Sequence, residues 1–257
     1  MLTAGVDIGA KTIKIVILED GRIRAKNLTL AGYDVRESLE KAWGDLEASS
    51  GLGAGDMEKI VATGAGRQEV IMAAASVTEV TAAAKGAISL DQSVRTVIDV
   101  GAEEGRAIRI DEAGRVVDFA VNEKCAAGAG AFAEAVARAL EVPLELLGPL
   151  SLRSTKAVAM NAQCAVFAES ELVALIHSQT PKPDMARAIH DAISDRIASM
   201  VRRVGLDPNV MLIGGLARNV GFLTSLRKDL NHEVIVPEDP DYIGALGAAL
   251  IAAEKAS

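Results

Sequence analysis

The sequence predicts an α/β protein that contains two similar domains, and three observations support this. The stretch AGVDIGAKTIKIVILEDGRI reads as a strand, a turn around Gly9, a second strand and a turn at Asp20-Gly21. The stretch VIDVGAEEGRAIRIDEAGRV repeats this plan, with Asp99 matching Asp7 and Gly101 matching Gly9. Half of the 257 residues are hydrophobic and only 3% are aromatic, which is typical of closely packed aliphatic α/β proteins. A single long duplication indicates two domains rather than an array of short repeats.

Helical and strand patterns fill the space between the two hairpins. Val35–Ala48 has the apolar spacing of an amphipathic helix, and Lys59–Thr63 reads as a short buried strand. A helix is expected from Glu79, with Gly86 as its C-cap. We therefore place the first domain at residues 1–93 and the second at residues 94–257.

The second half continues the pattern of strands and helices. Asp184–Val204 is a predicted long amphipathic helix, and Asn209–Ile213 is a predicted buried strand. A further strand is expected at Val234–Val236. Small residues follow Ile243 in a final helix, which could pack back onto the first domain.

The charge balance and the apolar pattern limit the classes of partner. The formal net charge is −8, from 27 basic and 35 acidic residues, and there is no basic tract. A nucleic-acid-binding surface is therefore disfavoured. No apolar run is long enough to span a membrane, and the N-terminus reaches its first turn too early for a signal peptide. These features predict a cytoplasmic protein.

The repeated Asp-x-Gly turn is a candidate phosphate site. An aspartate at the end of a strand can hold a divalent cation, and the glycine allows backbone N–H groups to face a phosphate. One such turn is weak evidence, since Asp and Gly are common in turns. The same turn in two matching hairpins is stronger evidence, and it predicts that Asp7 and Asp99 bind a nucleotide's phosphates from two sides.

A second glycine turn follows the strand at Asn209–Ile213. Gly214-Gly215 would let a flat ring or a sugar approach the bare backbone. A tight strand-to-helix turn explains the same two residues equally well.

The two cysteines, Cys125 and Cys164, each come just before a predicted helix. A helix N-terminus stabilises an anion such as a thiolate. Cysteines in such a chain are most often small buried hydrophobes, and a disulfide is disfavoured without a secretory context. Two thiolates fall short of the four ligands of a closed zinc site or an iron–sulfur cluster. A metal interpretation therefore requires a second chain.

The two hairpins, the Gly-Gly turn and the closing GALGAA helix together resemble the acetate and sugar kinase, heat-shock chaperone and actin superfamily of ATPases. This resemblance covers essentially the whole chain and implies duplicated ribonuclease-H-like domains. NEKCAAGAGAF and CAVFAESE are similar to motifs of the BadF/BadG/BcrA/BcrD ATPase family. This family comprises activators of 2-hydroxyacyl-CoA dehydratases and the ATPase subunits of benzoyl-CoA reductase. The hairpin DVGAEEGR is most similar to the BcrD-type subunit.

The resemblance implies an ATP-hydrolysing electron-transfer subunit. Each subunit would give two cysteines to one [4Fe–4S] cluster shared across a dimer. ATP with Mg²⁺ would drive low-potential electrons to an acyl-CoA reductase, with dearomatising benzoyl-CoA reductase as the first expectation. The implied partners are a homologous ATPase subunit in a heterodimer or homodimer, acyl-CoA-binding reductase subunits and a ferredoxin-type electron donor.

The predicted site residues fall into three groups. The catalytic residues would be Asp7, Asp99 and Glu103, and Glu103 stands where the family has Gln. The metal ligands would be Cys125 and Cys164. The nucleotide-binding residues would be Gly9, Ala10, Lys11, Thr12, Gly101, Ala102, Gly128, Gly130, Gly214, Gly215, Ala217 and Asn219.

Three other functions stay open at this point. The chain could be a homodimeric activator of a 2-hydroxyacyl-CoA dehydratase, which gives rare activating electrons. It could be a small-molecule kinase of the same superfamily, in which the cysteines would be inert. It could also be a non-catalytic subunit that holds the cluster and binds nucleotide only for assembly.

Overall fold

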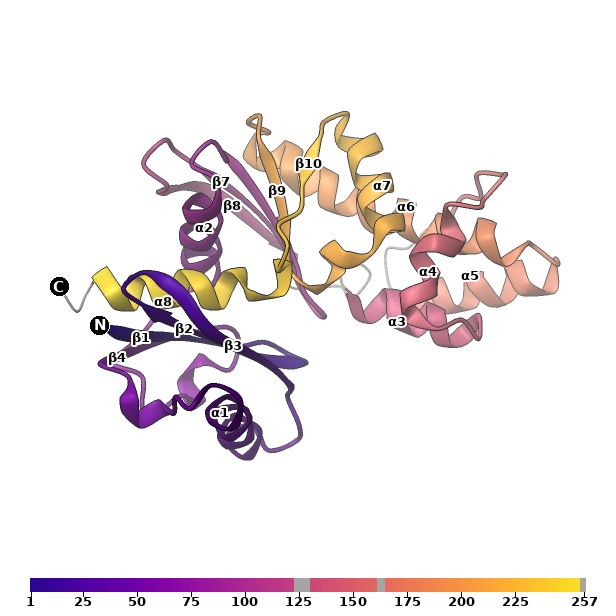
Figure 1. The fold of residues 1–257 in the computed structure, drawn as a ribbon. Helices are drawn as coiled ribbons and strands as arrows, with labels where there is room; N and C mark the ends of the chain where they lie inside the picture. The colour runs from indigo at the N-terminus through magenta and orange to yellow at the C-terminus, as the bar shows by residue number, and fades with distance from the viewer. Residues whose placement is uncertain (123–129, 161–164, 255–257) are drawn as a thin grey trace. The chain divides into compact units, whose positions relative to one another are not determined.

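The computed structural model of the chain describes residues 1–122, 130–160 and 165–254, with only the backbone described for residues 165–169 (Figure 1). The chain separates into two compact units. Unit 1 contains Met1–Arg95, Ile110–Val117 and the segment from Asp241 onward. Unit 2 contains Thr96–Arg109 and the described part of Asp118–Pro240. The domain boundaries expected from the sequence, residues 1–93 and 94–257, stay a prediction.

Unit 1 contains a five-stranded sheet in the order β3-β2-β1-β4-β5. β1 pairs antiparallel with β2, which pairs antiparallel with β3, whereas β4 and β5 run parallel to β1. The strands are β1 (Leu2–Ile8), β2 (Thr12–Glu19), β3 (Arg22–Leu30), β4 (Lys59–Thr63) and β5 (Ala75–Ser76).

The sheet that begins in unit 2 has the same topology. Its order is β10-β9-β6-β7-β8, in which β6 pairs antiparallel with β7 and parallel with β9. Each strand therefore has a counterpart in the first sheet, which confirms the duplication predicted from the hairpins. The strands are β6 (Thr96–Val100), β7 (Gly105–Ile110), β8 (Val116–Asn122), β9 (Val210–Ile213) and β10 (Val234–Ile235).

The helices differ between the two units because unit 2 has a long helical insertion between β8 and β9. Among the described helices, none combines the length and apolar character needed to cross a bilayer. The helices are α1 (Val35–Ser50), α2 (Glu79–Leu90), α3 (Gly130–Ala139), α4 (Leu144–Ser151), α5 (Ala165–His177), α6 (Lys182–Val204), α7 (Val220–Leu230) and α8 (Ile243–Glu254), with short 3-10 helices η1 (Ala54–Asp56), η2 (Arg67–Glu69), η4 (Gly215–Arg218) and η5 (Pro240–Tyr242).

In unit 1, helices cover both faces of the sheet. Trp43 and Leu46 of α1 are buried in one core with Val6 and Ile8 of β1. On the other face α8 lies directly on β1, since a Cβ atom added to Gly5 would stand 1.9 Å from the carbonyl oxygen of Ala245. The C-terminal helix is thus part of the core of unit 1.

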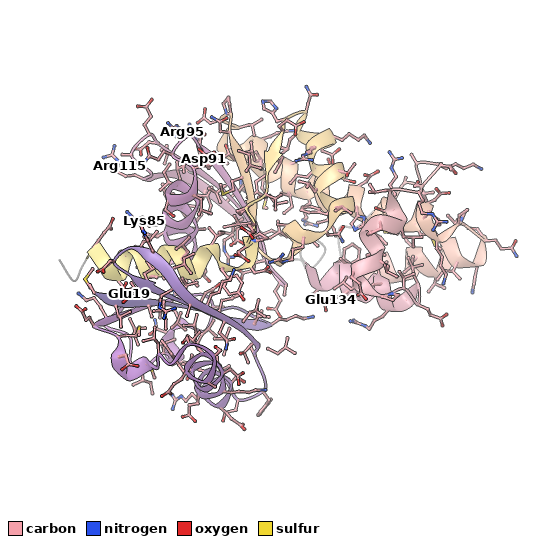
Figure 2. All side chains as sticks on the ribbon, viewed as in Figure 1. Glu19, Lys85, Asp91, Arg95, Arg115 and Glu134 are labelled. Atoms are coloured by element: carbon pink, nitrogen blue, oxygen red, sulfur yellow. The ribbon has the colours of Figure 1, made fainter. Side chains whose placement is uncertain are left out.

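Helix α2 packs against α8 on this same side of unit 1. Lys85, labelled in Figure 2, forms an ion pair with Glu254 near the end of α8. The prediction of Gly86 as a C-cap is wrong, because α2 continues to Leu90 and is capped by Asp91. Gly86 is instead buried inside the helix, where an added Cβ would stand 2.2 Å from the carbonyl oxygen of Ile243. Close helix packing, not helix termination, requires this glycine.

The core of unit 2 is organised around the long helix α6. Its buried residues Ile193 and Ile197 belong to one cluster with Ile98 of β6 and Leu212 of β9. Helix α7 packs beside α6 through two short hydrogen bonds, each 2.6 Å, which Ser194 donates to Asp229 and Ser225 to Asp191. The helices of the insertion between β8 and β9 therefore share one apolar core with the sheet.

Candidate functional site

Each hairpin pairs its strand-end aspartate with a basic residue on the next strand. In unit 1 Asp7 stands opposite Lys14 in the register of β1 and β2, and Asp7 Oδ2 lies 3.4 Å from Lys14 Nζ. In unit 2 Asp99 stands opposite Arg106, and Asp99 Oδ2 lies 3.1 Å from Arg106 Nη1. All four side chains are less than one-fifth exposed. Burial of a charge is costly without a partner, so each aspartate depends on its neighbouring cation.

The loops that follow the two aspartates are closed in the same way. The N–H of Gly9 donates to the carbonyl oxygen of Thr12 at 3.0 Å, and the N–H of Gly101 donates to that of Glu104 at 2.9 Å. In the first loop Ala10 and Lys11 are exposed. In the second loop the Glu103 side chain is also exposed. Both loops are therefore compact turns whose tips reach solvent, which suits contact with a ligand.

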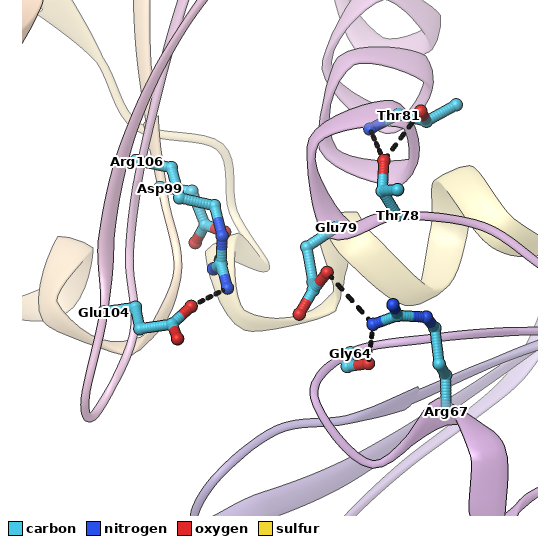
Figure 3. Close-up of polar contacts among 8 residues, drawn as sticks. All are labelled: Gly64, Arg67, Thr78, Glu79, Thr81, Asp99, Glu104 and Arg106. Atoms are coloured by element: carbon cyan, nitrogen blue, oxygen red, sulfur yellow. Dashed lines mark hydrogen bonds and ion pairs between the residues drawn. The ribbon is translucent and has the colours of Figure 1, made fainter. Parts of the chain in front are cut away.

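The two hairpins differ in how the basic residue is held. Arg106 also forms an ion pair with Glu104, so its guanidinium lies between two carboxylates (Figure 3). Lys14 lies instead against the turn, because a Cβ atom added to Gly9 would stand 3.2 Å from its Nζ. An arginine can bind two carboxylates through its planar fork, whereas lysine is a compact point charge. The second hairpin therefore holds its cation more firmly than the first.

A glycine in a left-handed conformation packs against each aspartate. Gly64 follows β4 with φ +93°, and Gly214 follows β9 with φ +86°. A Cβ atom on Gly64 would stand 2.5 Å from Asp7 Oδ1, and one on Gly214 would stand 2.7 Å from Asp99 Oδ1. Because β4 runs parallel to β1, and β9 to β6, these strand ends meet at the same edge of each sheet. Each unit thus forms the same small site from a hairpin and a glycine turn.

The residues predicted to flank an adenosine have different surroundings. Gly215 is exposed, whereas Ala217 is only 3% exposed and belongs to the core of unit 2. The side-chain oxygen of Asn219 caps α7, since it accepts hydrogen bonds from the N–H groups of Gly221 and Phe222 at 3.0 and 3.1 Å. A contact of these residues with adenosine stays a prediction.

The first turn of α3 is hydrogen-bonded to the second hairpin loop. The N–H of Gly130 donates to the carbonyl oxygen of Gly101, and the N–H of Ala131 donates to that of Ala102, both at 2.8 Å. Helix α3 is the first described element after Cys125. The loop beside Asp99 and the helix that follows this cysteine are therefore directly connected.

The predicted metal ligands lie outside the described residues. These are Cys125 and Cys164, and the same is true of Gly128. Helix α5 begins at Ala165, the residue after Cys164 in the sequence. Across the described ranges, no three His, Cys, Asp or Glu side chains come together in a way that could hold a metal ion.

Residues 154–156, which precede Cys164 in the sequence, are hydrogen-bonded to the start of α6. Asp184 is 2% exposed and accepts hydrogen bonds from Ser154 Oγ at 2.8 Å and from the N–H groups of Thr155 and Lys156 at 2.9 and 3.1 Å. These bonds, that of Ser154 above all, lower the pKa of Asp184 from its ordinary value, because they favour the charged carboxylate. The segment at residues 154–156 is thereby held to the core of unit 2.

Several site residues were not identified from the sequence. Lys14 and Arg106 could have been found from the hairpin register, since they are the first basic residues opposite the aspartates. Arg67 had no such signal. It donates from Nη1 to the carbonyl oxygen of Gly64 at 3.0 Å and lies 3.6 Å from Glu79 at the start of α2 (Figure 3). Its role depends on two segments that only the fold brings together.

Curated relatives match the chain from end to end. The 2-hydroxyisocaproyl-CoA dehydratase activator of Clostridioides difficile is 35% identical, over 100% of this chain and 96% of the relative. The (R)-2-hydroxyglutaryl-CoA dehydratase activating ATPase of Acidaminococcus fermentans is 36% identical, over 99% and 98%. A benzoyl-CoA reductase subunit of Thauera aromatica is 32% identical, over 97% and 92%.

Solved structures agree with these matches. The activator of the 2-hydroxyisocaproyl-CoA dehydratase from Clostridium difficile, with bound ADPNP, has a TM-score of 0.95 at 35% identity, over 100% of this chain and 96% of that chain. A ROK family glucokinase from Streptomyces griseus has a TM-score of 0.61 at 16% identity, over 99% and 100%, which shows a shared fold alone. The predicted fold, that of the sugar kinase, chaperone and actin superfamily, is confirmed. The sequence matches the BadF/BadG/BcrA/BcrD ATPase family over residues 4–252, and the chain therefore belongs to this family.

Proposed function

We propose that this chain is the ATP-hydrolysing activator of a 2-hydroxyacyl-CoA dehydratase. The observation that carries the proposal is the match over the whole chain to two such activators, at 35% and 36% identity. The benzoyl-CoA reductase subunit is less similar, at 32%. This order reverses the first expectation from the sequence, in which the reductase came before the activator.

The hairpin loop and the glycine turn of each unit would contribute to nucleotide binding. Gly9, Ala10, Lys11 and Thr12 would face the phosphates in unit 1, and Gly101 and Ala102 would do so in unit 2. Asp7 and Asp99 are suited to hold Mg²⁺, directly or through water, since carboxylate oxygens are its preferred ligands. Exposed loop tips and turns that have no space for a side chain support this assignment.

The chemistry required of these residues is mainly positioning. Phosphoryl transfer depends on charge neutralisation and on an oriented water molecule more than on covalent chemistry. Lys14 and Arg106 neutralise the two aspartates in the described structure. Glu103 is exposed at the tip of its loop, where it could orient the attacking water. We therefore assign binding to the backbone loops and charge control to the four paired side chains.

An iron–sulfur cluster would connect this ATPase to electron transfer. Cys125 and Cys164 would provide two of four thiolates, and a second copy of the chain would provide the others. The start of α5 next to Cys164 supports this, because the positive end of a helix favours an anionic group. A [4Fe–4S] cluster would supply single electrons at low potential to the dehydratase, and a ferredoxin-type donor would replace them.

The hydrogen bonds between α3 and the second hairpin support a coupling of the two activities. Any displacement of Gly101 and Ala102 on nucleotide binding would act on the N–H groups of Gly130 and Ala131. The same helix follows the segment that contains Cys125. ATP hydrolysis and electron delivery would then be linked through the backbone of α3.

The deciding experiment is anaerobic purification with measurement of iron, acid-labile sulfide and subunit composition in one sample. A homodimer with about two irons per chain supports the proposal, because four irons are shared by two chains. Replacement of Cys125 or Cys164 by Ser should remove the iron but retain the fold. Absence of iron under strict exclusion of oxygen would contradict the cluster and leave a nucleotide-binding protein of another kind.

A second candidate is an ATPase subunit of a benzoyl-CoA reductase. It is favoured by the hairpin DVGAEEGR and by the 32% identity to the Thauera aromatica reductase subunit over 97% of this chain. The composition of the purified complex separates the two candidates. A stable complex with different companion chains would favour the reductase, whereas a homodimer that separates easily from its dehydratase would favour the activator.

A further inference from the structure

We infer that Arg67 is a positioning residue, which holds the glycine turn after β4 against the Asp7 carboxylate and so determines how unit 1 binds nucleotide phosphates. This inference rests on the proposed nucleotide-binding function and adds a residue to it. Arg67 lies on the short helix η2, and its own contacts lie within unit 1.

The turn and the end of β1 are packed together without spare space. A Cβ atom on Gly64 would stand 2.3 Å from the carbonyl oxygen of Ile8 and 2.5 Å from Asp7 Oδ1. The N–H of Gly66 donates to the same Ile8 carbonyl oxygen at 2.9 Å. A shift of this turn would therefore displace the Asp7 carboxylate or the loop that follows it.

Arg67 makes two hydrogen bonds to this turn and one ion pair to α2. Its backbone N–H donates to the carbonyl oxygen of Gly64 at 3.2 Å, and its Nη1 donates to the same oxygen at 3.0 Å. Nη1 also lies 3.6 Å from the carboxylate of Glu79. The Arg67 and Glu79 side chains are only 31% and 22% exposed, so this is not a freely solvated surface pair. The guanidinium thus joins the glycine turn to the start of α2.

The carboxylate that anchors Arg67 is itself fixed in place. Glu79 is the first residue of α2, where the helix dipole favours a negative charge. Thr78 caps this helix, since its hydroxyl accepts a hydrogen bond from the N–H of Thr81 at 3.2 Å (Figure 3). Arg67 is therefore attached to the end of a capped helix rather than to a loop.

Unit 2 contains a similar arrangement. Arg218 lies on the short helix after Gly214, and its Nη2 is 3.9 Å from Asp239, shortly before α8. These side chains are more exposed, at 54% and 36%. In each half a basic residue after the glycine turn pairs with an acid close to the helix that follows the last strand of the sheet, α2 after β5 and α8 after β10, which indicates that the pair belongs to the duplicated site. The Arg67–Glu79 pair in unit 1 is shorter and more buried than the Arg218–Asp239 pair. Arg67 should therefore hold its glycine turn more firmly than Arg218 does.

The test uses the full chain with R67Q and the matched control R36Q. Arg36 pairs with Glu69 at the other end of η2, at 2.9 Å, but both side chains are more exposed, at 64% and 40%. Affinities for Mg·ADP and for adenosine are measured by calorimetry, well below the thermal midpoint of each variant. We expect R67Q to weaken Mg·ADP binding by about tenfold, as is common when supporting contacts of a site are lost, with adenosine binding unchanged. R36Q should bind both ligands as the wild type does.

Two further variants keep the test valid if R67Q does not fold. E79Q removes the anchor and should show the same selective loss, while R67K keeps a cation near Glu79 and should restore part of the affinity. An equal loss for Mg·ADP and adenosine, or wild-type affinity in R67Q, would overturn the inference alone. A wild-type chain that binds neither ligand would overturn the proposed function and this inference with it.

Discussion

Gly64 and Gly214 both have a positive φ, +93° and +86°, at the ends of β4 and β9. Each lies against the oxygen of a strand-end aspartate, Asp7 or Asp99, and against the carbonyl oxygen of the residue that follows it. A left-handed glycine with no room for a Cβ atom in both halves of the chain shows that the duplication extends to the geometry of the site.

Substitution of these glycines by alanine should therefore destabilise the protein in two ways. A positive φ of this kind alone costs an L-residue about 1–3 kcal/mol, and the clash with backbone oxygens adds to this cost. Gly21 is a matched control, since it has φ +78° and open space where its Cβ would lie. We expect Gly64→Ala to lower the free energy of unfolding clearly more than Gly21→Ala in denaturant titrations. Equal losses would show that the turn can relax around the added methyl group.

The Asp7–Lys14 pair should be energetically coupled. Both side chains are about 15% exposed, so removal of one partner leaves a poorly solvated charge. A double-mutant cycle with Asp7→Asn and Lys14→Met should give a coupling energy of about 1–3 kcal/mol from unfolding free energies. The exposed pair Arg24–Glu19, at 3.5 Å, is the control and should give less than about 1 kcal/mol. A coupling no larger than that of the control would mean that the pair is effectively solvated.

Asn219 can be tested as a helix cap separately from any role at the nucleotide. Asn219→Ala should lower the free energy of unfolding by about 1 kcal/mol, because two N–H groups at the start of α7 lose their acceptor. Asn219→Asp replaces the amide oxygen by a carboxylate oxygen that can accept the same hydrogen bonds, and it should retain this stability. If Asn219 also contacts adenosine, Asn219→Asp should weaken adenosine binding in calorimetry although the protein is stable. Full stability of Asn219→Ala would argue against the capping role.

His190 should make unit 2 sensitive to acid. It is fully buried on α6, and neither ring nitrogen has a hydrogen-bond partner among the described residues. Burial lowers its pKa from 6.5 to about 4, and the nearby Asp191 opposes this only in part. The unfolded chain therefore binds a proton between pH 6.5 and 4 that the folded chain does not. His190 should not reduce the free energy of unfolding above pH 6.5. As the pH drops from 6.5 to 4, this free energy should fall by roughly 3 kcal/mol.

The pH dependence can be assigned by substitution. His190→Gln should reduce the slope of unfolding free energy against pH between 6.5 and 4, even if it lowers stability at pH 7. His177→Gln is the control, since His177 is exposed at the end of α5. An unchanged slope in His190→Gln would assign the acid sensitivity to carboxylates instead.

Much of the fold could be predicted because its signals are local. The strand at Lys59–Thr63 and the start of the helix at Val35 were predicted at the positions where they occur. The turn at Asp20-Gly21 was also correct, and both residues have positive φ there. Turn residues and apolar periodicity act over a few residues, so they can be recognised without knowledge of the rest of the chain.

The error at Gly86 has the opposite cause. A glycine near the end of a helical pattern usually indicates a cap, but here the main chain of Ile243 lies against it. Residues 86 and 243 are far apart in the sequence, so no local pattern could reveal this contact. Tertiary packing outweighed local preference, as it often does for small residues in closely packed helices.

The features of the candidate site also divide into those that local sequence determines and those that depend on tertiary contacts. The two Asp-x-Gly turns, and hence the predicted phosphate site, follow from residues adjacent in the sequence. The contacts of Lys14 with Asp7 depend on strand register, and those of Gly64 with Asp7 depend on the parallel pairing of β1 and β4. The contact of Arg67 with Glu79 depends on where α2 starts relative to that turn. Turn chemistry and hairpin register act over a few residues, whereas the contacts of Gly64 and Arg67 form only when the chain closes longer loops around a shared core.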